Sequence, residues 1–234
     1  MKRELLRLLV AAHVNNQPAV LIRSLTSSRR FLIDENGTCG DVDDIPAELL
    51  QRGRDALGRD GSVTVDIAAE RYLLQTLSPP PQLIIVGAVH IAQQLVPMAR
   101  SAGYDVLLID PRAAFAAPQR FPGVEVINEW PQEAMGGLSL NRRAAVITLS
   151  HDPKIDEPAL RSALESEAFY IGALGSKKNH TSRLKRLADF GYDDKALRRI
   201  AGPIGLPLGG RSPAEIAVSI LAQIIQTRYC QESA

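Results

Sequence analysis

The sequence predicts an α/β protein with two parts: a small α+β unit at residues 1–77 and a Rossmann-like, doubly wound parallel sheet at residues 83–234. After residue 82 the chain alternates between short apolar runs and stretches with helical spacing. This alternation is typical of a parallel sheet whose two faces are covered by helices. Between the two parts, Ser78 is followed by three prolines, which favour a stiff, extended chain. We therefore expect a linker at residues 78–82.

The first part has mixed periodicity, which is why we expect an α+β unit there. Helical spacing occurs at residues 2–13 and again at residues 44–57. Asn36-Gly37 is a strong turn signal. Apolar and β-branched residues indicate strands at 19–25, 29–34, 62–67 and 70–77.

The second part contains five expected strands, at residues 83–88, 104–110, 124–128, 144–150 and 168–174. Helices are expected at residues 90–102 (with Pro97 inside), 158–165 and 177–190. A last helix should begin after Ser212, with Pro213 in its first position and Glu215 completing a capping box. We expect the strand order 3-2-1-4-5, which places a ligand crevice beyond the carboxyl ends of strands one and four.

Bulk composition excludes several classes of function. A net charge of +1 with only 5% aromatic residues gives no reason to expect a nucleic-acid partner. No apolar run approaches the roughly 20 residues of a transmembrane helix, and Glu4 and Arg7 interrupt the N-terminal run that could resemble a signal peptide. Cys39 and Cys230 are too few for a disulfide framework or a clustered zinc site. We expect a cytoplasmic protein.

The turn after the first strand of the second part partly matches a dinucleotide-binding fingerprint. Gly87 and Ala92 fit its first and third positions, but Val89 stands at the second, where its branched side chain should crowd a pyrophosphate. Asp110, at the end of the next strand, is placed to accept a ribose hydroxyl. The alternative is structural: Gly87 makes a tight turn and Asp110 caps a loop.

Two histidines follow the strands that flank the expected crevice. His90 begins one helix and His151 follows the fourth strand, so the topology should bring them together. An imidazole can bond a ligand oxygen, take up a proton or ligate a metal, although a loop histidine is often simply solvated. Asp152 and Lys154 add charge suited to a polar, anionic ligand, and we interpret Asp156 as a cap of the following helix.

A glycine-bracketed loop after the fifth strand is a candidate phosphate cradle. Gly172 and Gly175 flank the strand end, and Ser176 can cap the following helix. Lys177 and Lys178 would oppose the helix dipole unless an anion compensates them. A solvated basic face is the alternative.

Together these motifs resemble the xanthine dehydrogenase accessory protein family, XdhC/CoxI. The matching segments are G-A-x-H-[IV]-A (87–92), Ile109-Asp110-Pro111-Arg112, H-D-P-K-x-D (151–156), YIGALGSKK (170–178) and the stretch from Pro203 to Ile220. The resemblance implies a cytoplasmic, homodimeric factor that binds molybdenum cofactor (molybdopterin) as cargo. It would deliver this cargo to a xanthine or carbon monoxide dehydrogenase-type apo molybdenum hydroxylase, with a cysteine desulfurase as a further partner if sulfuration is coupled. The implied cofactor-binding residues are Gly87, Ala88, His90, Asp110, Arg112, His151, Asp152, Gly172, Gly175, Ser176 and Lys177.

The N-terminal part departs from the family pattern. Members usually carry a G-G-C motif, whereas this chain has Cys39-Gly40-Asp41, so it resembles a divergent member. Three hypotheses stay open: a cofactor-binding maturation factor, an NAD(P)- or FAD-dependent oxidoreductase, and a cofactor-free partner of a dehydrogenase. Val89 argues against the second, and the missing motif favours the third.

Overall fold

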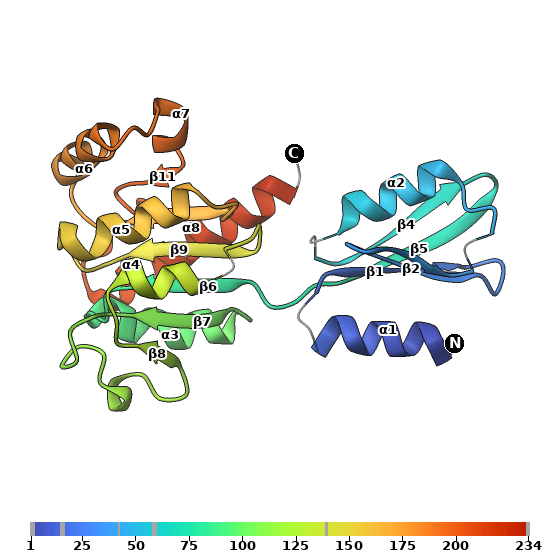
Figure 1. The fold of residues 1–234 in the computed structure, drawn as a ribbon, viewed down its shortest axis with the longest axis horizontal. Coiled ribbons are helices and arrows are strands. Elements are labelled where there is room, and N and C mark those ends of the chain that lie inside the picture. Colours follow the sequence, from blue (N-terminus) through green and yellow to red (C-terminus); the bar gives the residue numbers. More distant parts are fainter. Residues whose placement is uncertain (1–2, 15–16, 42, 58–59, 139, 233–234) are drawn as a thin grey trace. The chain divides into compact units, whose positions relative to one another are not determined.

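The computed structural model describes residues 3–14, 17–41, 43–57, 60–138 and 140–232. The chain divides into two compact units, Met1–Pro80 and Pro81–Ala234, and the division falls within the proline run. Each unit has its own hydrophobic core, and its elements are labelled in Figure 1.

The N-terminal unit is an antiparallel sheet between two helices. Its strands are β1 (Ala19–Ser24), β2 (Arg30–Asp34), β3 (Gly37–Gly40), β4 (Ser62–Ile67) and β5 (Glu70–Leu77), in the order β3-β2-β1-β5-β4. Helices α1 (Arg3–Val14) and α2 (Ala47–Ala56) lie on opposite faces of this sheet (Figure 1). Side chains alternate along β1, so Val20 and Ile22 pack with Leu49 of α2, whereas Ala19 packs with Leu5 of α1.

The C-terminal unit is built on a six-stranded parallel sheet in the order β11-β10-β9-β6-β7-β8. The strands are β6 (Gln82–Val86), β7 (Asp105–Ile109), β8 (Glu125–Ile127), β9 (Ala144–Thr148), β10 (Tyr170–Ala173) and β11 (Ile200–Ala201). The helices are α3 (His90–Ser101), α4 (Pro131–Ala134), α5 (Pro153–Leu164), α6 (Lys177–Asp189), α7 (Asp194–Leu197) and α8 (Pro213–Glu232), with short 3-10 turns η1 (Pro118–Arg120) and η2 (Met135–Gly137).

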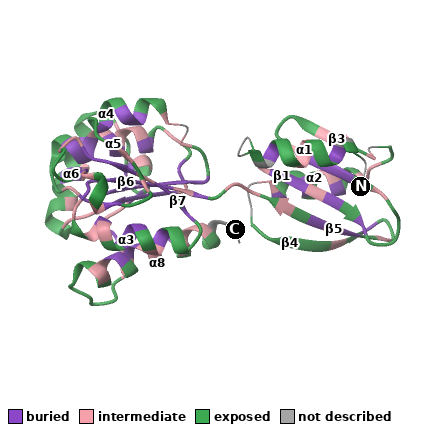
Figure 2. Ribbon diagram, turned by 90° about the horizontal axis from the view of Figure 1, so that it is seen from below, coloured by how far each residue is buried: buried purple, intermediate pink, exposed green. Residues whose placement is uncertain are grey.

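Both faces of the parallel sheet are covered, which explains its continuous apolar strands. Leu83 and Ile85 of β6 pack on one face with α3 and α8, and Ile84 and Val86 pack on the other with α4 and α5. Figure 2 shows β6 as a buried strand inside its unit. The doubly wound sheet and the 3-2-1-4-5 order are confirmed, with β11 added at the edge.

Several boundaries differ from the sequence prediction. Helix α5 begins at Pro153 rather than Pro158, because Asp152 caps it and proline suits the first helical position. Gln82, placed in the linker from the sequence, is the first residue of β6. The short elements β3, α4, α7 and β11 were not predicted, since two to four residues carry too little periodicity. The capping box between Ser212 and Glu215 is confirmed in both directions.

Candidate functional site

The turns after β6 and β9 contact one another at the carboxyl edge of the parallel sheet. Gly87 has φ +108°, and a Cβ built there would lie 2.7 Å from the backbone nitrogen of Ser150. The amide of Leu149 donates to the carbonyl of Val86 at 2.8 Å. Glycine is therefore required at position 87 by the close approach of two backbone segments. The same approach brings the loops that carry His90 and His151 to one edge.

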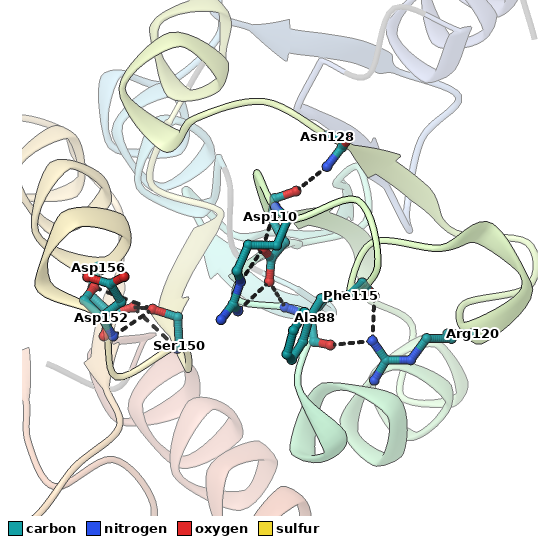
Figure 3. Close-up of polar contacts among 9 residues, drawn as sticks. Ala88, Asp110, Phe115, Arg120, Asn128, Ser150, Asp152 and Asp156 are labelled. Carbon is teal, nitrogen blue, oxygen red and sulfur yellow. Dashed lines mark hydrogen bonds and ion pairs between the residues drawn. The ribbon is translucent and has the colours of Figure 1, made fainter.

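Asp110 is fully buried and links the turn after β6 to the turn after β7 by hydrogen bonds (Figure 3). One carboxylate oxygen accepts from the Ala88 amide at 2.8 Å and from Nη2 of Arg112 at 2.8 Å. The other accepts from the Arg112 amide at 3.0 Å and from its Nε at 2.9 Å. Burial alone would raise the pKa of Asp110, but these hydrogen bonds outweigh it and lower the pKa below the ordinary value. The bonds give Asp110 a structural role, and the predicted ligand-binding role stays a prediction.

Both backbone groups of Ala88 are engaged. Its amide donates to Asp110, and its carbonyl accepts from Nη1 of Arg120 at 3.0 Å (Figure 3). Arg112, whose side chain is 35% exposed, stacks over the ring of Phe115 at 4.1 Å. The Ala88 amide is consequently not available to a pyrophosphate, and the accessible group beside it is the Arg112 guanidinium.

The two histidines lie at this edge as exposed residues. His90 is the first residue of α3, and His151 directly follows Ser150. His151 has φ +65°, a left-handed conformation that a residue with a side chain seldom adopts. Joint action of the two imidazoles on a ligand stays a prediction.

The loop between β9 and α5 corrects the interpretation of Asp156. Asp152 is the helix cap, since its side chain accepts from the Lys154 amide at 2.9 Å. Asp156 is 1% exposed and instead accepts from Oγ of Ser150 at 2.6 Å and from the Ser150 amide at 3.3 Å (Figure 3). Burial raises the pKa of the Asp156 carboxyl, although the Ser150 hydrogen bonds and the Arg183 charge partly oppose the rise. Asp156 therefore closes the loop back onto the end of β9.

The loop between β10 and α6 ends in an exposed, basic helix start. Ser176 caps α6 by accepting from the Asn179 amide at 3.2 Å, and Gly175 has φ +141°. The first turn contains exposed Lys177 and no acidic residue. Gly172, by contrast, is buried, and a Cβ there would lie 2.5 Å from Cδ1 of Ile204. Gly172 thus has a packing role, whereas the start of α6 is open to an anion.

Arg183 is a buried residue of α6 that the sequence places near the candidate phosphate cradle, with a solvated basic face as the alternative. It is 5% exposed, donates through Nη2 to the Leu174 carbonyl at 2.8 Å and lies 3.7 Å from Asp156. The sequence feature that could have indicated its burial is its position one turn before Leu187, on the same side of α6. Arg183 and Asp156 both help line a pocket of about 230 Å³ between α5 and α6.

The described part of the chain offers neither a metal centre nor a membrane-spanning helix. Within the described ranges, no group of three or more His, Cys, Asp or Glu side chains is placed to hold a metal ion. Among the helices that the structure describes, none is long and apolar enough to cross a membrane.

The comparisons with known proteins agree with one another on a single family. The chain is 28% identical over 205 residues to a probable xanthine dehydrogenase subunit of Bacillus subtilis, covering 87% of this chain and 59% of that protein. It is 31% identical over 154 residues to the molybdenum cofactor insertion chaperone PaoD of Escherichia coli, covering 66% and 42%. The chain thus spans about half the length of these curated relatives.

The fold also matches a solved structure. A crystal structure described as a xanthine dehydrogenase from Bacillus halodurans superposes with a TM-score of 0.76 and 24% identity, covering 99% of this chain and 67% of that one. The family described as the XdhC Rossmann domain matches residues 83–224, which is more than half of the chain. This protein therefore belongs to the XdhC family.

Proposed function

We propose that this protein is a maturation factor that binds molybdenum cofactor as cargo and helps to insert it into a xanthine or carbon monoxide dehydrogenase-type molybdenum hydroxylase. Membership of the XdhC family and the name of the Escherichia coli relative, an insertion chaperone, support this role. In this proposal the partner is the apo form of the hydroxylase. The protein acts in the cytoplasm as a homodimer, and a cysteine desulfurase joins it when the cofactor is sulfurated.

The observation that carries the proposal is the polar edge at the ends of β6, β9 and β10. The start of α6 offers backbone amides and Lys177 without an acidic residue in its first turn, which suits the phosphate of a molybdopterin. His90, at the start of α3, and His151, in the loop that follows β9, are exposed at this edge, which supports contact with the polar groups of the cargo. The Arg112 guanidinium adds a partly exposed positive charge at the same edge.

The same edge gives little support to an NAD(P)- or FAD-dependent oxidoreductase. Asp110, the expected ribose acceptor, is fully buried, and both of its oxygens already accept from Arg112. The Ala88 amide, which could meet a pyrophosphate, is bonded to Asp110. These contacts favour the cofactor-binding chaperone over the oxidoreductase.

The test is direct binding of isolated molybdenum cofactor to anaerobically purified protein, with molybdenum and pterin both counted per chain. Wild type is compared with His90→Ala, His151→Ala and Lys177→Ala. His13→Ala, in the N-terminal unit, and Lys195→Ala, in α7, are the matched controls. We expect near-stoichiometric binding by wild type and by the controls, and weaker binding by the three site variants.

Two other results would contradict the proposal. A folded wild-type protein that binds no cofactor would refute cargo binding, and saturable NAD(H) binding by that protein would favour the oxidoreductase. Cofactor binding that is unchanged in all three site variants would place the cargo elsewhere on the chain.

A further inference from the structure

The pocket between α5 and α6 has a polar lining of which the proposed site uses only His151. Its volume is about 230 Å³, and its polar lining comprises His151, Asp156, Asn179, Ser182, Arg183 and Arg186. Four of these residues project from one side of α6, at spacings of three and four residues. The volume is smaller than the roughly 300–1,000 Å³ of a site for a whole drug-sized ligand, so it suits one part of a larger molecule.

Two buried side chains of this lining have unmet hydrogen-bonding capacity. Oδ2 of Asp156 and Nη1 of Arg183 have no hydrogen-bond partner among the described residues, although the residues are only 1% and 5% exposed. The nearest contact between them, from Nη2 of Arg183 to Oδ2 of Asp156, is 3.7 Å. Buried polar atoms are nearly always paired, so a missing pair of this kind points to a partner. That partner has to supply one donor and one acceptor, side by side.

Charge balance decides the class of ligand. Arg183 faces Asp156, and Nε of Arg186 donates to Glu157 at 2.6 Å. The two positive charges are therefore matched by two carboxylates, and a phosphate in the pocket would meet the Asp156 carboxylate as well as the guanidinium groups. A neutral, planar group with adjacent donor and acceptor satisfies both buried atoms without adding charge.

We propose that this pocket binds the aminopyrimidinone edge of a pterin, with its N–H groups donating to Asp156 and its carbonyl accepting from Arg183. The two unmet atoms are shielded from solvent, so this binding mode requires both side chains to turn toward the pocket. This assignment rests on the proposed function, because it places the pterin of the proposed cargo in the pocket between α5 and α6. The phosphate would then lie at the start of α6, whose residues also form the pocket wall.

The experiment uses 6-hydroxymethylpterin alone, titrated into the full chain and followed by pterin fluorescence. Ser182→Met fills the pocket from its exposed wall, where the serine hydroxyl donates to the Lys178 carbonyl of its own helix. Thr181→Met is the matched control, since Thr181 is exposed and bonds in the same way to the Lys177 carbonyl but does not line the pocket. We expect Ser182→Met to abolish pterin binding and Thr181→Met to leave it unchanged.

Asp156→Asn tests the hydrogen bonds of the pocket without changing its volume. The change keeps the shape but removes the charge and one acceptor, so we expect pterin binding about tenfold to a hundredfold weaker. Asp189→Asn, at the end of α6, is its control. Circular dichroism and urea unfolding establish that each variant folds.

The outcomes separate this inference from the proposed function. Wild type that does not bind the pterin, or Ser182→Met that binds it as wild type does, would overturn the pterin pocket and leave ordered water as its occupant. If Ser182→Met still binds molybdenum cofactor stoichiometrically, cargo binding stands and only the pocket assignment fails. Pterin binding that Ser182→Met and Asp156→Asn both weaken, while the two controls do not, supports the assignment.

Discussion

Replacing Asp110 with asparagine tests the reasoning about the sheet edge most directly. The carboxylate is fully buried and accepts from the Ala88 amide, the Arg112 amide and two guanidinium nitrogens of Arg112. The asparagine side chain would keep one acceptor oxygen, but its NH₂ group would face donors on the other side. The Arg112 ion pair would lose its negative partner.

The magnitude follows from these contacts. Removing one partner of a fully buried ion pair costs about 3–5 kcal/mol, and because Arg112 is 35% exposed we take the effect as about 2 kcal/mol here. An unsatisfied buried donor at the Ala88 amide adds about 1 kcal/mol. We therefore expect a loss of about 3 kcal/mol in the free energy of unfolding, and a Tm lower by roughly 6–12 °C.

The assay is urea unfolding followed by tryptophan fluorescence. The sequence contains one tryptophan, Trp130, and it lies in the C-terminal unit, so its signal reports the unit that contains Asp110. Asp105→Asn, an exposed position at the other end of β7, is the matched control and should change stability little. A loss of less than about 1 kcal/mol in Asp110→Asn would refute the view that Asp110 ties the loops together.

Three further predictions follow from the same structure. Gly87→Ala should destabilise the C-terminal unit by about 2 kcal/mol or more in urea unfolding. The reason is that the φ of +108° and the 2.7 Å distance from an added Cβ to the Ser150 backbone leave no room for a side chain. Gly136→Ala should be nearly neutral, because no atom lies within 4 Å of a Cβ added there. Ser212→Ala should cost about 1 kcal/mol in the same assay through loss of the α8 cap, and an unchanged midpoint would contradict the capping role. The difference in unfolding free energy between wild type and Asp110→Asn should be fully present above the unfolded-state pKa of about 4. It should narrow as the pH falls through the lowered pKa of Asp110 in the folded state. A difference that stays constant on acidification would show that the ionised carboxylate does not provide the stability.

Local patterns were sufficient for most of the elements. Strands β4 and β5 have the bounds expected from alternation, and α8 begins with the expected Ser212–Glu215 capping box. The continuous apolar run of β6 already implied a strand covered on both faces, and the strand–helix alternation indicated a doubly wound sheet, whose usual strand order is confirmed. The strands and the cap depend on neighbours within a few residues of one another, so one sequence contains the information they need.

The chemistry of the site depended on contacts that no local pattern encodes. The sequence leaves Asp110 with two roles, a ribose acceptor or a loop cap, and only the tertiary structure shows that it is buried against the Ala88 amide, 22 residues earlier in the chain. Asp156 was interpreted as a helix cap, whereas it closes onto Ser150 and faces Arg183 of a different helix. Whether a charged side chain binds a ligand, caps a helix or pairs with a distant charge depends on burial and on partners far along the chain. The residue pattern was thus enough to predict the parallel sheet, the order of five of its strands and the edge of the candidate site. Which polar atoms at that edge are paired, and which lack a partner, became visible only in the folded chain, because the partners come from distant segments.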